Sequence, residues 1–177
     1  MSVVVRNLQR SVIVNSFFVK RDFNLLRKIM GLQQLDVALV FLSKNKMTEY
    51  NKEYRQKDTS TDILSFPSLV DTISRVAVAN PGHGLCYNDM IDTQECDLGD
   101  IYLCPETMMV KYNLKEYEIR KATVPLMCHG LLHLCGYLHD TDVQSNIMNE
   151  REDAVLKEFS SITGEKFESL GYYDALD

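Results

Sequence analysis

Three of the four histidines in this 177-residue chain lie close together, at His129, His133 and His139. The first two are four residues apart, so a helix places both imidazoles on one face, one turn apart. Gly136 then lets the backbone leave the helix and bring the third histidine back to the other two. Three neutral imidazoles leave one tetrahedral position of a zinc ion open to water, as in catalytic zinc sites. We therefore expect one zinc ion held by these three side chains.

The position after the first histidine limits the chemistry of this site. The spacing HxxxHxxGxxH is also that of the metzincin proteases, in which a glutamate directly follows the first histidine and acts as general base. Here that position is Gly130, which has no side chain to accept a proton. Peptide hydrolysis by that route is therefore disfavoured, although the metal-binding spacing is intact.

A second charged stretch precedes the strand expected at residues 61–67. It contains Arg55 and Lys57, which have the charge to bind an anion such as a phosphate. The same residues are also typical of solvated charges near the end of a helix, where cations interact favourably with the helix dipole. Taken alone, the stretch favours the second interpretation.

Composition excludes several classes of protein. The net charge of −6 argues against a generally basic nucleic-acid binder, although residues 1–60 carry a balance of +6 and the remainder −12. No apolar run is long enough for a membrane span, and the first twenty residues do not fit the pattern of a secretory signal, so we expect the protein not to be secreted. Five cysteines without a CxxC pair then favour free thiols in a reducing compartment. The first twenty residues contain three cations and no acid, so either a first β-strand, which we favour, or a mitochondrial transit peptide fits them.

The hydrophobic pattern predicts one α+β domain over residues 1–177, with a mixed sheet of about four strands packed against helices. We expect a loop or insertion at about residues 71–97 and a loose C-terminal tail. The expected β-like runs are 3–6, 11–14, 35–42, 61–67 and 100–103, and the expected helices are 21–31, 44–54, 105–112, 116–134 and 142–159. The three histidines of the expected metal site lie on the long helix that ends near residue 134 and in the turn after it.

Three stretches in this order and spacing resemble the YbeY family of endoribonucleases. The family pattern N-x-x-Y-R-x-K-D-x-x-T-D-V-L-S-F-P is similar to residues 51–67, L-G-D-I to residues 98–101, and H-G-x-L-H-L-x-G-Y-D-H to residues 129–139. The chain departs from the pattern at Leu138, where the family has an aspartate, and at Ser60, where it has a proline. The resemblance covers most of residues 1–160.

The resemblance implies a zincin-like site and metal-dependent cleavage of single-stranded RNA, in ribosomal RNA maturation and ribosome quality control. It makes Arg55 and His129 the catalytic residues, Arg55 and Lys57 the substrate-binding residues, and zinc the ion. The N-terminal stretch and residues 71–97 are similar to eukaryotic members, which implies a mitochondrial location, or a cytoplasmic one if the chain is not eukaryotic.

Two other functions stay open at this point. One is a ribosome-assembly factor that acts by binding, with a zinc ion that only stabilises the fold. The acidic C-terminal half would suit a basic partner for it, such as a small-subunit ribosomal protein. The other is a metal hydrolase of a different substrate, against which Gly130 argues in the case of peptides.

Overall fold

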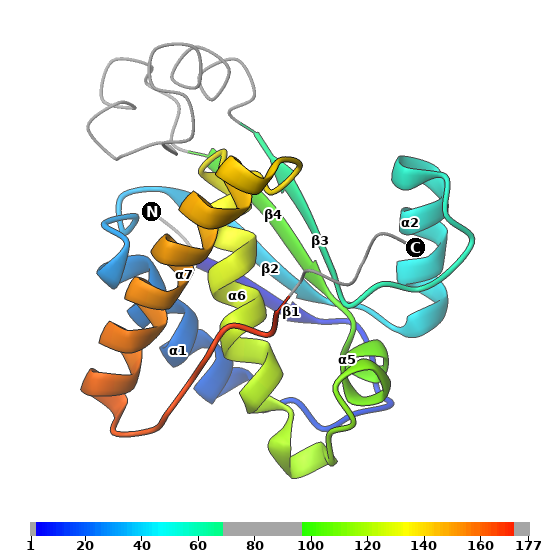
Figure 1. The fold of residues 1–177 in the computed structure, drawn as a ribbon. Coiled ribbons are helices and arrows are strands. Elements are labelled where there is room, and N and C mark those ends of the chain that lie inside the picture. The colour runs from blue at the N-terminus through cyan, green and yellow to red at the C-terminus, as the bar shows by residue number, and fades with distance from the viewer. Residues whose placement is uncertain (1–2, 69–96, 172–177) are drawn as a thin grey trace.

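A four-stranded mixed sheet forms the centre of the fold (Figure 1). The computed structural model describes residues 3–68 and 97–171. The strands lie in the order β1 (Val3–Asn7), β2 (Asp36–Phe41), β4 (Asp97–Leu103) and β3 (Ile63–Pro67). β2 is parallel to both β1 and β4, whereas β3 is antiparallel to β4 and forms one edge. The expected α+β class with a mixed sheet is therefore confirmed.

The two faces of the sheet carry different layers, because side chains alternate along a strand. In β2, Val37 and Leu39 belong to the large core, whereas Val40 and the following Leu42 belong to a smaller cluster around Met47. The large core packs against α1 (Ser16–Ile29), α6 (Arg120–Leu134) and α7 (Asp142–Thr163). The smaller cluster packs against α2 (Lys44–Arg55), and α5 (Pro105–Lys111) follows β4.

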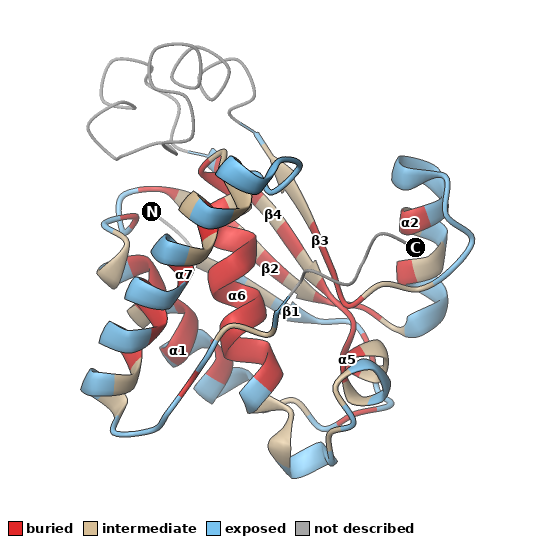
Figure 2. Ribbon diagram, viewed as in Figure 1, coloured by how far each residue is buried: buried red, intermediate tan, exposed pale blue. Residues whose placement is uncertain are grey.

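Helix α6 is the central helix of the molecule. It contacts β3 and β4 on one side and α1 and α7 on the other, and it is buried along nearly its whole length (Figure 2). Pro125 lies inside it without ending it. Any polar side chain on this helix must therefore find a partner within the protein, because burying an unpaired polar group is costly.

One expected strand is wrong. Residues 11–14 form no strand, because the buried side chain of Gln9 organises a turn there instead. Its amide nitrogen donates to the carbonyl oxygen of Val12 at 2.9 Å, and its amide oxygen accepts from the backbone N–H groups of Ser11 and Val12 at 2.8 and 3.0 Å. Such side-chain bonds replace the ladder bonds that a strand would need.

Several boundaries also differ from the expected ones. Asn15 caps α1, accepting from the N–H groups of Phe17 and Phe18, so this helix begins at Ser16 instead of residue 21. The helix expected from residue 116 begins as a separate 3₁₀ turn, η1 (Glu116–Glu118), before α6. Of the expected loop at 71–97, only Asp97 lies within the described residues, as the first residue of β4.

After α7, Phe167 is buried and its ring lies 5.3 Å from that of Phe159. The expected tail beyond residue 171 lies outside the described residues. Within the described ranges, no helix combines the length and the apolar character that crossing a bilayer requires.

Candidate metal centre

The last turns of α6 and the turn after them bring His129, His133 and His139 together. One possible ligand atom from each lies within 4.8 Å of the others. The Nε2 atoms of His129 and His133 are 2.9 Å apart, close to the ~3.3 Å expected between two nitrogens on one tetrahedral zinc ion. Gly136 makes the turn with a φ of 86°, a left-handed conformation that glycine adopts without strain. This cluster is the one the histidine spacing predicts, and its donor set fits a zinc ion.

The other ring nitrogen of each helical histidine has its own partner. His133 Nδ1 lies 2.9 Å from the carbonyl oxygen of Tyr137, and because a carbonyl can only accept, Nδ1 carries the proton. His129 Nδ1 lies 3.4 Å from Oε2 of Glu152. Both contacts leave the Nε2 atoms facing each other, as metal ligation requires.

The protein keeps these imidazoles neutral. Burial lowers the pKa of His129 to about 3, and the charge of His139 acts in the same direction. Burial likewise lowers the pKa of His133 to about 3, with help from the charges of the two other histidines. A neutral imidazole has a free lone pair at the nitrogen that lacks the proton, so both side chains are ready to bind an ion at neutral pH.

Arg55 belongs to the surroundings of this cluster, although it lies far from the histidines along the chain. It is the last residue of α2, which ends at Gln56 in a left-handed conformation. Desolvation lowers the pKa of Arg55, and the charge of Asp62 opposes that shift. The positive charge of Arg55 in turn contributes to the lowered pKa of His129 and His133.

Lys57 lies two residues beyond the end of α2. It is exposed, and its backbone N–H donates to the carbonyl oxygen of Asn51 at 3.3 Å. The contacts and charges described above therefore join the three histidines and Arg55, whereas the Lys57 side chain is exposed.

Sequence reasoning missed a polar cluster beside the histidines. Asp62 is 3% exposed and accepts hydrogen bonds from the Tyr112 hydroxyl at 2.5 Å and from Nζ of Lys111 at 3.1 Å. Burial opposes ionisation of Asp62, but these partners outweigh it and lower its pKa. The charges of both Asp62 and Lys111 act on His129. Lys111, on α5, is thus a second cation of the site. The sequence did not indicate it because it lies at a distance from the other motifs.

Comparison with known proteins decides the family. A sequence model described as Endoribonuclease YbeY matches residues 9–160. The chain belongs to the YbeY endoribonuclease family. The human Endoribonuclease YbeY is 30% identical over 171 residues, covering 96% of this chain and 95% of the relative. Endoribonuclease YbeY of Clostridioides difficile (strain 630) is 32% identical over 128 residues, covering 71% and 72%.

A solved structure also resembles this chain. It is a solution structure of a Thermotoga maritima protein, with a TM-score of 0.48 and 21% identity, covering 91% of this chain and 93% of the other. The predicted YbeY membership is confirmed, as is the expectation of an endoribonuclease-family enzyme with a three-histidine metal site.

A further residue that sequence reasoning missed is Glu152 on α7. It is 0% exposed, burial raises its pKa to about 8, and its Oε1 atom has no hydrogen-bond partner in the described part of the chain. The pattern of α7 offered a signal for it. Met148, Val155, Leu156 and Phe159 form the buried stripe of this helix, and Glu152 occupies a position of the same stripe.

The structure also explains the glycine of this YbeY chain at position 130. A Cβ atom there would lie 2.9 Å from Cδ1 and 3.0 Å from Cγ2 of Ile101, and 3.1 Å from Cδ1 of Ile63. Helix α6 therefore lies directly against β3 and β4 at this point. The protease glutamate is absent, and no side chain at this position fits without a shift of its neighbours.

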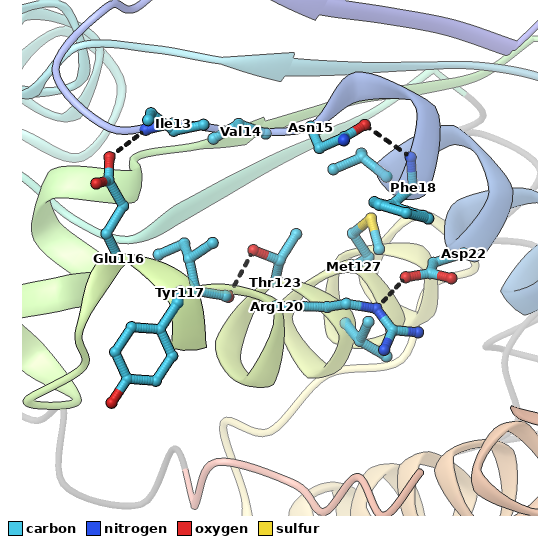
Figure 3. Close-up of a pocket in the computed structure, with 13 residues that line it drawn as sticks. Ile13, Val14, Asn15, Phe18, Asp22, Glu116, Tyr117, Arg120, Thr123 and Met127 are labelled. Carbon is cyan, nitrogen blue, oxygen red and sulfur yellow. Dashed lines mark hydrogen bonds and ion pairs between the residues drawn. The ribbon is translucent and has the colours of Figure 1, made fainter. Parts of the chain in front are cut away.

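A cavity of about 380 Å³ lies elsewhere, between α1, η1 and the first half of α6 (Figure 3). Val19, Thr123 and Met127 form part of its buried lining, and the exposed side chains of Ile13 and Tyr117 lie at its edge. Neither the three histidines nor Arg55 and Lys57 line it. It is therefore separate from the metal centre.

Proposed function

We propose that this YbeY-family protein is a zinc-dependent endoribonuclease that cleaves single-stranded RNA in ribosomal RNA maturation and ribosome quality control. The convergence of three imidazoles on one point, two of which burial keeps neutral, carries the proposal. The family membership supports the reaction, and the human and clostridial relatives are named endoribonucleases. The histidine-only donor set supports zinc, which prefers such ligands.

A bound zinc ion would act as a Lewis acid toward a phosphate oxygen and would bring the pKa of its water to about 7. His129, His133 and His139 would hold that ion. Because position 130 has no room for a carboxylate base, the chain supplies no base there. A water molecule that zinc has already partly ionised near neutral pH would need no base at this position.

Positive charge is the second contribution of the chain. Arg55 can form bidentate hydrogen bonds to a phosphate and offset the negative charge that grows in the transition state. An interaction made mainly in the transition state raises kcat more than affinity. Lys57 adds a cation that would hold the RNA backbone by charge, whereas the charge of Lys111 is paired with Asp62.

The first test measures bound zinc and cleavage of a single-stranded RNA on the same preparations of wild type and His133→Ala. The proposal expects one equivalent of zinc and cleavage in the wild type, with both lost in the variant. Zinc without cleavage of several RNAs in the wild type would favour a ribosome-binding factor with a structural metal. Cleavage of unfolded protein instead of RNA would favour a hydrolase of another substrate.

A mitochondrial location if the chain is eukaryotic, or a cytoplasmic one otherwise, and a small-subunit ribosomal protein as partner are also part of the proposal. The three cations among the first twenty residues support the location. Residues 3–7 form β1, paired with β2, so cleavage within the first twenty residues would remove a strand of the sheet. We therefore expect a tagged full-length chain to reach its compartment with the first twenty residues retained. Mass spectrometry of the recovered protein would check this.

A further inference from the structure

A buried carboxylic acid lies behind the metal centre. Glu152 on α7 is fully buried, on a helix that packs along α6 (Figure 1). Burying a carboxyl group costs free energy unless it is hydrogen-bonded or paired. Its neighbours on the buried face of α7 are Met148 and Val155, which offer it nothing polar from their side chains. A polar partner for Glu152 must therefore come from the facing helix, α6.

The partner on that helix is His129. Oε2 of Glu152 lies 3.4 Å from Nδ1 of the imidazole, and the Nε2 atom of the same ring lies 2.9 Å from Nε2 of His133. A carboxyl oxygen at this place can accept the Nδ1 proton and so leave the Nε2 lone pair free toward the ion, and a cation bound at Nε2 would favour the ionised form of Glu152. His133 obtains the same arrangement from the carbonyl oxygen of Tyr137. The two helical ligands thus each have an acceptor behind them, one neutral and one acidic.

We propose that Glu152 is a positioning residue for the metal centre, which fixes the ring and the tautomer of His129 so that Nε2 binds the ion. The inference rests on the metal centre of the proposed function, and it assigns a role to a residue outside the three recognised motifs. A carboxylate behind a ligating histidine also makes that ligand more basic. Loss of such a partner typically lowers metal affinity about 10- to 100-fold.

The experiment compares zinc affinity in Glu152→Gln, Glu152→Ala and a control, Val155→Ala. Val155 is 1% exposed and lies on the same buried face of α7, so its truncation reports the general effect of a cavity in this helix. The dissociation constant is measured by competition with a chromophoric chelator, on protein shown to be folded by circular dichroism. The absorption bands of the cobalt-loaded proteins report the geometry of the ligands separately.

We expect Glu152→Ala to weaken zinc binding by about 10- to 100-fold and to change the cobalt spectrum. Glu152→Gln keeps an acceptor oxygen but loses the negative charge, so it should weaken binding less. Val155→Ala should bind zinc within a few-fold of wild type with an unchanged cobalt spectrum. If Glu152→Ala does not fold, the glutamine variant, of nearly the same size, decides the matter.

Two results would overturn the role of Glu152 while the metal centre stands. One is tight zinc binding by wild type with the same affinity in both Glu152 variants. The other is an equal loss of affinity in Val155→Ala, which would make the effect one of packing. A wild-type protein that binds no zinc would instead refute the metal centre, and the role of Glu152 with it.

Discussion

The contact between α6 and the sheet at Gly130 predicts the effect of adding a single methyl group there. In Gly130→Ala, the new Cβ would approach two atoms of Ile101 and one of Ile63 to between 2.9 and 3.1 Å. Ile101 is 0% exposed, so its branched side chain has little room to move away. Overpacking of this kind costs about 1–3 kcal/mol, whereas alanine gains about 1 kcal/mol over glycine in a helix. The net expectation is a loss of about 1 kcal/mol in the free energy of unfolding.

The assay is urea unfolding of the metal-free protein, with the slope m compared between variants to detect changes in the unfolded state. A double-mutant cycle with Ile101→Val isolates the contact, because this change removes Cδ1, the closest atom. Ile101→Val alone should cost about 0.5–1.5 kcal/mol. The double variant should then lose less stability than the sum of the two single losses, by about 0.5–1 kcal/mol.

Gly130→Ala with a stability at or above that of wild type, or strictly additive losses in the cycle, would refute the close approach of α6 to the sheet. The same geometry predicts that Gly130→Glu, which restores the protease spacing, creates no peptidase. Its longer side chain has to displace Ile101 or Ile63, so we expect a poorly folded protein with little bound zinc.

The remaining predictions concern charge and metal. Arg55→Ala should lower kcat for RNA cleavage by about 100-fold or more with zinc content unchanged, as for other lost transition-state contacts; unchanged cleavage at equal zinc would remove Arg55 from the mechanism. Asp62→Asn should destabilise the protein at pH 7 by about 1.5–3 kcal/mol, because the folded state lowers the pKa of Asp62 through Tyr112 and Lys111. That contribution is fully present above the ordinary aspartate pKa of about 3.9 and is lost as the pH falls further, so the difference between variant and wild type in urea unfolding should shrink below about pH 4. Removal of zinc by a chelator should lower the melting temperature of wild type but leave that of His133→Ala unchanged, because a ligand that binds only the folded state stabilises it.

The metal ligands could be predicted from sequence because they are local. Two histidines four residues apart on a helix, followed by a glycine turn, fix the geometry within one short segment, and the structure brings His139 to the other two as the spacing predicts. The same holds for the sheet strands with clear apolar runs. The role of Lys57 and of Arg55 in binding RNA stays a prediction.

What sequence could not predict depends on long-range packing. The position of Glu152 on the apolar stripe of α7 indicates burial, but its partner His129 is known only once α7 packs on α6, and the ion pair of Asp62 with Lys111 joins residues 49 positions apart. The absence of the strand expected at residues 11–14 has a different cause. Its residues have β propensity, but the buried amide of Gln9 competes for their backbone bonds.

The arrangement of α6 and its turn has a consequence for damaged forms of the protein. All three histidines come from one short segment, and α7 directly follows it along the chain, whereas Arg55 arrives from α2 on the opposite face of the sheet. Variants that loosen α2 or the start of β3 would leave α6, the turn after it and α7 intact. Such proteins would be purified with a full complement of zinc and yet cleave poorly, so metal content would overestimate the active fraction of a preparation. Variants that loosen α7 would lose metal and activity together.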